Sequence, residues 1–204
     1  MERLCADIDV EYVPFWEIDE LSRSMLEERG GEHHYTPMSK AKHLYILQDI
    51  KRITSRLGLT MKWPAAPDNQ HWEVPHLAYL YARRKGKGEQ FFKSIHEARW
   101  NRGEDVCDPR TVAAVAVDCG LDPELTAGAL HRDEIRAEGV DELMKACEDG
   151  VFGIPFFVYG YNKFWGIDRF ELFLRSVRGS DTRDAPDIGN MLPYYETDHP
   201  GGCG

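Results

Sequence analysis

The chain has 204 residues, of which 42% are hydrophobic and 29% are charged, and its formal net charge at pH 7 is −10. This composition is ordinary for one globular domain or for a domain with an inserted subdomain. The negative charge disfavours a nucleic-acid or anionic-lipid partner, and no run of about 18 apolar residues predicts a membrane span. The N-terminus lacks the pattern of a signal peptide, so we expect a cytoplasmic protein.

The five cysteines indicate neither a disulfide framework nor a four-cysteine zinc site, because their number is odd and no C-x-x-C pair occurs. They are Cys5, Cys107, Cys119, Cys147 and Cys203. We expect reduced, mostly structural thiols. The His33-His34 pair lacks ligand spacing, so we interpret it as part of a polar loop and predict no metal site.

The first predicted elements are a strand and a helix. Residues 8–13 alternate apolar and polar side chains, which predicts a half-buried strand. Ser39 is a suitable N-cap for a helix that runs to about Leu57 and ends at Gly58. The apolar stripe of this helix consists of Leu44, Leu47, Ile50 and Leu57.

A block of further helices follows. We predict them over 75–86 and 89–101, from Asp108-Pro109 to Gly120, from Asp122-Pro123 onward, and over 132–149. An Asp-Pro pair supplies an N-cap and a preorganised first residue. In the helix over 89–101 we expect Phe92, Ile95 and Trp100 to face a core.

The chain then changes to strand patterns. Strands are predicted at 155–159 and 162–165, joined by a tight turn at Gly160-Tyr161, and a last helix over 167–177. The tail from residue 179 has little apolar pattern, and we expect it to be mobile. This order of elements predicts an α/β fold with a helical insertion.

Four motifs in order resemble those of the 2-hydroxychromene-2-carboxylate isomerases, which share a DsbA-like thioredoxin fold with the kappa-class glutathione transferases. They are K-x-x-Y-x-x-x-D at Lys42, Tyr45 and Asp49, W-x-x-G-x-D-V-x-D-P at 100–109, V-F-G-I-P at 151–155, and F-W-G-I-D-R at 164–169. The resemblance implies a thioredoxin-like (DsbA-like) sheet with a large helical insertion. Residues 1–38 and 150–178 would form the thioredoxin-like part, 39–149 the insertion, and 179–204 a flexible tail.

The resemblance also implies a cofactor site. It predicts a cis peptide bond before Pro155 that turns the backbone of Ile154 toward the cysteinyl part of glutathione. The alternative is an ordinary trans proline at the start of a strand. The resemblance assigns Asp168 to the ammonium of the γ-glutamyl group. The alternative is that this aspartate is only an N-terminal cap of the helix.

The predicted site includes two further residues, Ile167 and Lys42. Relatives usually carry Ser, Asn or Gln at the position of Ile167, so we expect a weaker polar grip on glutathione, and another low-molecular-weight thiol stays open. The resemblance places Lys42 near the cofactor carboxylates or the substrate. The alternative is a solvated surface lysine. We interpret Trp63 and Trp165 as wall and core residues rather than as recognition elements.

The catalytic residue is unknown from this sequence. The resemblance implies a Ser or Cys at the start of a helix that follows a first strand, and the sequence has no such segment before residue 8. Three explanations stay open: a start codon further upstream, a strand supplied by a second chain, or a rearranged scaffold without the chemistry.

The resemblance implies a thiol-dependent isomerase that acts on a small conjugated carbonyl or aromatic-derived substrate. Glutathione transfer and DsbA-like thiol oxidoreduction are alternatives, and the lack of C-x-x-C disfavours the latter. A non-catalytic binding or assembly protein is the alternative from another class. We expect a small-molecule substrate, no nucleic-acid or membrane partner, and we allow for a homodimer.

Overall fold

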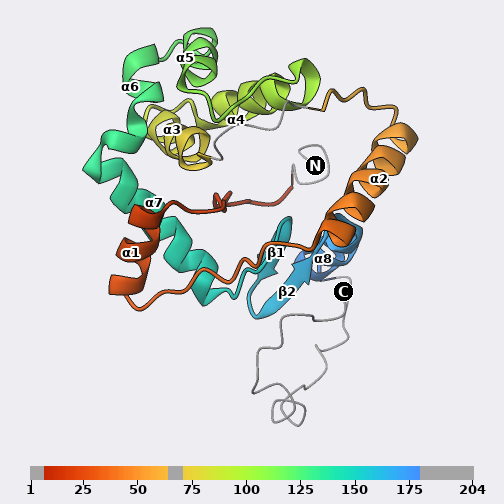
Figure 1. The fold of residues 1–204 in the computed structure, drawn as a ribbon. Helices are drawn as coiled ribbons and strands as arrows, with labels where there is room; N and C mark the ends of the chain where they lie inside the picture. Colours follow the sequence, from red (N-terminus) through yellow and green to blue (C-terminus); the bar gives the residue numbers. More distant parts are fainter. Residues whose placement is uncertain (1–6, 64–70, 180–204) are drawn as a thin grey trace. The chain divides into compact units, whose positions relative to one another are not determined.

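The computed structural model describes residues 7–63 and 71–179, which fold into two compact units (Figure 1). The small unit contains residues 7–12, 34–36 and 151–179 of the described part, and the helical unit contains 13–33 and 37–150. No helix in the described ranges combines the length and the apolar character needed to cross a membrane.

The bounds of the elements are as follows. The helical unit contains α1 (Glu20–Glu28), α2 (Lys40–Arg56), α3 (Glu73–Arg84), α4 (Gly88–His96), the π-helix η2 (Glu97–Arg102), α5 (Pro109–Asp118), α6 (Pro123–Ala127), the 3-10 helix η3 (Ala129–His131) and α7 (Asp133–Glu148). The small unit contains β1 (Phe156–Tyr159), β2 (Asn162–Trp165), the 3-10 helix η4 (Ile167–Arg169) and α8 (Phe170–Val177).

Side-chain caps start several helices where the sequence predicts them. The side chains of Ser39, Asp108 and Asp122 accept hydrogen bonds from backbone N–H groups in the first turns of α2, α5 and α6. These caps confirm the predicted starts. The helix α1, which the sequence analysis did not predict, begins in the same way, with Asp19 accepting from the N–H of Ser22 at 2.9 Å.

The core of the helical unit lies on two sides of α3. Leu77 and Leu80 pack with α1 and α7, whereas Ala78 and Ala82 pack with α4 and α5. This arrangement needs an α3 that is apolar around most of its circumference, as buried helices are. No residue of α2 is buried, although the apolar stripe predicted for it is present in the sequence.

The predicted core face of α4 was partly wrong. Phe91 is fully buried, whereas Phe92 is 39% exposed. The buried positions Phe91, Ile95 and Ala98 follow the i, i+4, i+7 spacing of one helix face, and Phe92 lies outside that row. Ile95 is buried as predicted, and Trp100 is half-buried.

The small unit is a two-stranded antiparallel hairpin packed on one helix. The register pairs Phe156 with Trp165 and Phe157 with Phe164. Phe157 and Phe164 pack against the buried cluster of α8, which consists of Phe170, Phe173 and Leu174. Because side chains alternate along a strand, Phe156 and Trp165 lie on the opposite face of the hairpin.

The prediction of a strand at residues 8–13 was wrong. These residues form no strand, because the sheet of the described chain contains only β1 and β2. Their alternation predicted the burial only in part. Ile8 and Val10 are half-buried and Ile8 packs against the α8 cluster, whereas Tyr12 is 44% exposed. A strand also needs a hydrogen-bonded neighbour, and the hydrophobic pattern does not supply one.

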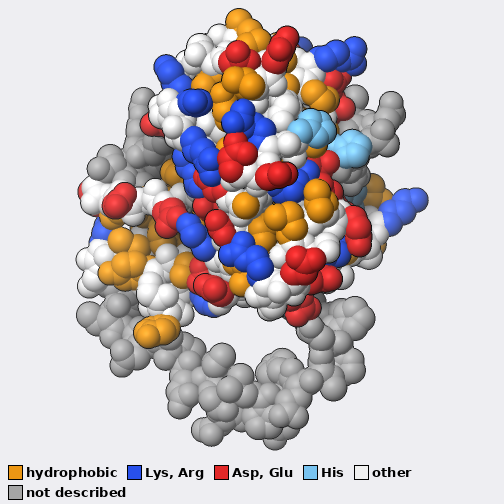
Figure 2. Space-filling model, turned by 90° about the vertical axis from the view of Figure 1, so that its left-hand side faces the viewer, with side chains coloured by type: hydrophobic (Ala, Val, Ile, Leu, Met, Phe, Trp, Pro, Cys, Tyr) orange, Lys and Arg blue, Asp and Glu red, His pale blue; other side chains and the backbone are white. Residues whose placement is uncertain are grey.

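The domain boundaries of the sequence analysis stay a prediction. In the structure, residues 13–33 pack with the helical unit, and α1 lies against α7. The predicted mobile tail lies outside the described residues from position 180 on. On the face drawn in Figure 2, basic side chains lie among acidic ones, so the net negative charge forms no broad acidic patch there.

Candidate functional site

Four of the five predicted site residues lie in the small unit. They are Ile154, Pro155, Ile167 and Asp168. The peptide bond between Ile154 and Pro155 is cis, which confirms the prediction. The N–H of Gly166 donates to the C=O of Pro155 at 2.9 Å. This hydrogen bond joins the start of β1 to the segment that carries Ile167 and Asp168.

The segment that leads into β1 has a free backbone edge in the described part of the chain. Backbone groups of successive residues point to opposite edges of a strand, and the C=O of Pro155 points toward β2. Phe156, the first residue of β1, therefore has its N–H and C=O on the other edge. In the described part of the chain, Ile154 forms no hydrogen bond, and it is 65% exposed. Such an edge can accept an extended ligand backbone.

The carboxylate of Asp168 is oriented by its neighbours. Its Oδ2 accepts from Nη1 of Arg169 at 2.7 Å, and its side chain is 69% exposed. Its Oδ1 lies over Gly166, where an added Cβ would be only 2.6 Å away. Gly166 also has a φ of 95°, which favours glycine. Glycine at 166 therefore leaves the space that this carboxylate occupies.

The pairing with Arg169 leaves Asp168 able to bind another cation. Exposed ion pairs of this kind contribute about 0–1 kcal/mol, so a ligand ammonium can displace or share the guanidinium. The site residue beside it, Ile167, is 49% exposed. It offers no polar side-chain group, and the weaker grip on glutathione expected from the sequence stays a prediction.

An aromatic cluster borders the site. The ring of Phe152 meets those of Phe156 and Trp165 edge-on, with centroid distances of 5.6 and 4.9 Å. Phe152 and Trp165 are 47% and 40% exposed. The cluster gives the segment before Pro155 an apolar wall, which agrees with the interpretation of Trp165 as a wall residue.

The remaining predicted site residue, Lys42, belongs to the helical unit. It lies in the first turn of α2, where its backbone N–H donates to Oγ of the N-cap Ser39 at 3.3 Å. Its side chain is exposed. The predicted proximity of Lys42 to Pro155 stays a prediction.

The motif at 100–109 has structural roles in the helical unit. Gly103, at a φ of 73°, closes the π-helix, and a carboxylate oxygen of Asp105 accepts from the N–H of Cys107 at 2.9 Å. Asp108 caps α5. The C=O of Trp100 accepts from the N–H of Lys62, which anchors the segment after α2. We therefore assign this motif to the fold rather than to the chemistry.

Cys107 is poorly suited to act as a nucleophile. Cys107 and Cys119 are buried, and Sγ of Cys147 accepts from the N–H of Glu32 at 3.1 Å. Burial, followed by the nearby charge of Asp105, raises the pKa of Cys107 to about 12, so its thiolate is scarcely populated at neutral pH. Among residues 7–63 and 71–179, no three His, Cys, Asp or Glu side chains gather as metal ligands.

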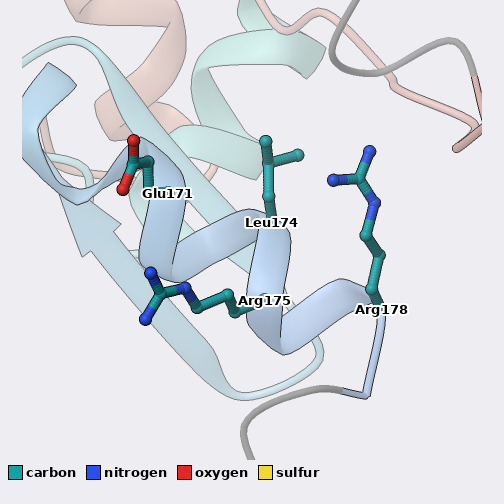
Figure 3. Close-up of a pocket in the computed structure, with 4 residues that line it drawn as sticks. All are labelled: Glu171, Leu174, Arg175 and Arg178. Carbon is teal, nitrogen blue, oxygen red and sulfur yellow. The ribbon is translucent and has the colours of Figure 1, made fainter.

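Figure 3 shows an open pocket on α8 that is lined by Glu171, Leu174, Arg175 and Arg178. The guanidinium groups of Arg175 and Arg178 point in different directions, so they do not converge on one ligand group. Arg178 also forms a two-point ion pair with Asp7, at 2.7 and 2.9 Å. The pocket contains none of the predicted site residues, and we do not regard it as the candidate site.

Sequence reasoning missed the two glycines of the site, Gly153 and Gly166. Both lie inside quoted motifs, V-F-G-I-P and F-W-G-I-D-R, so their position was visible. Their role was not, because it depends on which side chain lies over each Cα. Gly166 lies beneath Asp168, and Gly153 lies beneath Trp165.

Comparisons with known proteins agree with this fold. Residues 7–178 match the family of the DSBA-like thioredoxin domain. The chain is 28% identical over 131 residues to 2-hydroxychromene-2-carboxylate isomerase of Sphingobium xenophagum, covering 64% of this chain and 65% of that protein. It is 24% identical over 144 residues to human glutathione S-transferase kappa 1, covering 64% of each.

A solved structure of a 2-hydroxychromene-2-carboxylate isomerase has the same fold. Its TM-score to this chain is 0.60 at 18% sequence identity, and the match covers 87% of this chain and 80% of that one. The match agrees with the predicted thioredoxin-like fold with a large helical part. The aligned regions span just under two thirds of the length of the two curated relatives.

Proposed function

The chain belongs to the DSBA-like thioredoxin domain family, and from this membership we propose that it is a thiol-dependent isomerase-like enzyme. It binds glutathione or another low-molecular-weight thiol and acts on a small conjugated carbonyl or aromatic-derived substrate. The relatives named as an isomerase and a glutathione transferase support this proposal.

The observation that carries the proposal is that the backbone of Ile154 forms no hydrogen bond within the described residues, while the hydrogen bond between Gly166 and Pro155 joins its segment to that of Asp168. An extended thiol peptide places its own N–H and C=O against such an edge and adds two hydrogen bonds. Its α-ammonium then reaches a carboxylate that is 69% exposed and already oriented over Gly166. The two groups suit the cysteinyl and γ-glutamyl parts of glutathione.

The chemistry follows from the nucleophilic thiol of the bound cofactor. Its thiolate adds to the conjugated system, which turns the double bond into a single bond. Rotation about that bond and departure of the thiolate restore the double bond in the other geometry, with no net change in atoms or electrons. The protein's part is to hold the two reactants together and to favour the thiolate.

A second candidate function is transfer of glutathione to an electrophile, which the kappa-class relative supports. It differs in the last step, because the thioether product leaves intact instead of releasing the thiol. A thiol oxidoreductase is less favoured, since the sequence has no C-x-x-C pair.

Product analysis separates these functions. The full-length product of the gene is incubated with a conjugated aromatic 2-oxo acid, with and without glutathione, and the products are identified by mass and by geometry. Isomerisation that requires only catalytic amounts of thiol supports the proposal. A stoichiometric thioether favours transfer, and no thiol-dependent conversion of any such compound contradicts both.

A further inference from the structure

The segment before Pro155 is held by a contact between a glycine and an indole. A Cβ placed on Gly153 would lie 3.1 Å from Nε1 and 3.6 Å from Cε2 of Trp165. The first distance is closer than ordinary van der Waals contact, so no larger residue fits without moving the ring or the backbone. The indole of Trp165 therefore lies directly against the backbone of Gly153.

Trp165 is itself fixed from two directions. In the strand register it lies opposite Phe156, where side chains of an antiparallel pair touch on the same face. The ring of Phe152 meets its indole at 4.9 Å and meets Phe156 at 5.6 Å. The indole can thus serve as a fixed support for Gly153.

Ile154 lies between two anchors. On its C-terminal side, the C=O of Pro155 accepts from Gly166, and on its N-terminal side Gly153 rests on Trp165. Ile154 itself has neither a hydrogen bond in the described residues nor a buried side chain that would hold it. Its backbone direction therefore depends on these neighbours.

We propose that Trp165 and Gly153 are positioning residues, whose contact orients the N–H and C=O of Ile154 for the thiol ligand before it binds. This inference rests on the proposed function. Fixing the backbone of one residue has an entropic cost, so ordering Ile154 only upon binding would lower the affinity roughly tenfold. The contact removes that cost in advance.

A double-mutant cycle tests the contact. Gly153→Ala pushes the ring away, and Trp165→Val removes the support while keeping a good strand former. Each single variant should weaken glutathione binding about tenfold in calorimetry. The double variant should be no weaker than either one, because both remove the same contact. Additive, roughly hundredfold weakening would overturn the proposal.

A second readout needs no ligand. In ¹⁵N relaxation of the free protein, the amide of Ile154 should be as ordered as β1 in the wild type and mobile in both single variants. The control is Tyr161→Ala, at the fully exposed tip of the hairpin turn, which should leave Ile154 unchanged. If the amide of Ile154 is as ordered in Gly153→Ala as in the wild type, the contact does not position Ile154 and the proposal is wrong. If the wild type binds no thiol, the proposed function fails. The relaxation measurement still shows whether the contact between Gly153 and Trp165 orders the backbone of Ile154.

Discussion

At the scale of single residues, the site depends on a glycine that leaves room for the side chain of a neighbouring residue. Gly166 provides the space over which the carboxylate of Asp168 folds, and its φ of 95° suits few other residues. The carboxylate is thereby held close to the start of β1, with which Gly166 shares a hydrogen bond. A charged group held in this way can bind a ligand ammonium with little loss of its own freedom.

Asp168→Asn should weaken glutathione binding by about 1.5–3 kcal/mol, the range for a hydrogen bond to a charged group. This corresponds to roughly a ten- to hundredfold larger dissociation constant in calorimetry. The matched control is Glu171→Gln, which removes the same charge one turn further along. Equal effects of the two substitutions would mean that Asp168 acts only through the long-range electrostatic effect of its negative charge and not through a direct contact with glutathione.

Ile167→Ser should strengthen glutathione binding, because the hydroxyl adds a hydrogen-bonding partner for the γ-glutamyl group beside Asp168. The expected gain is about 0.5–1.5 kcal/mol, the net value of a typical hydrogen bond. Ile167→Ala serves as the comparison, since it removes the same apolar surface without adding a polar group. The idea fails if Ala and Ser give the same affinity.

His76 should make the stability of the protein depend on pH. Its Nδ1 donates to the C=O of Trp72 at 2.6 Å, and its ring stacks on Trp16. Burial, aided by the charges of His96 and Arg99, lowers the pKa of His76 from 6.5 to about 4. Between these two values the unfolded chain binds more protons than the folded protein, so stability falls as the pH is lowered from about 6.5 to about 4.

Urea unfolding of wild type and His76→Gln between pH 4 and pH 7.5 measures this dependence. The substitution keeps a side-chain donor for Trp72 and removes the titrating group, so the loss of stability below about pH 6.5 should be smaller in the variant. Parallel curves for the two proteins across that window would exclude His76 as the source.

At the scale of elements, α1 and α7 are joined by a partly buried ion pair. Nη1 of Arg136 donates to Oδ2 of Asp19 at 2.9 Å and to Oγ of Ser22 at 2.8 Å. The side chain of Arg136 is only 8% exposed. Asp19 is also the N-cap of α1, so one carboxylate both starts that helix and neutralises a charge of α7.

Asp19→Ala should therefore destabilise the protein by about 3–5 kcal/mol, because a buried guanidinium loses its partner. The free energy of unfolding in urea measures this loss. Asp141→Ala is the control, since it breaks the exposed pair with Arg29 and should cost about 1 kcal/mol or less. Similar losses in both variants would show that burial of the Asp19 pair does not matter.

Elements with a local signal were predictable from the sequence. The pairs Asp108-Pro109 and Asp122-Pro123 fixed the starts of α5 and α6, and Gly160-Tyr161 gave the turn of the hairpin. The failures depend on distant partners. Residues 8–13 carry a strand pattern without a neighbouring strand, and the π-helix at 97–102 has no pattern that distinguishes it from an α-helix.

At the scale of the whole molecule, the family resemblance gave the fold and the cis bond before Pro155, and the structure added the geometry around them. The contacts of Gly153 and Gly166 could not be predicted, because the residues that touch them come from other positions of the folded hairpin. Lys42 belongs to the helical unit, and its role at this site stays a prediction.

A titration of the ¹⁵N-labelled full-length gene product with glutathione, followed by amide chemical shifts, tests the central claim most directly. We predict saturable shifts that are largest at Ile154, Gly166, Ile167 and Asp168, with the Ile154 amide moving as a new hydrogen bond forms. The same titration of Asp168→Asn should require roughly ten- to hundredfold more ligand. Saturable shifts elsewhere, or none with glutathione and other small thiols, would contradict the thiol site.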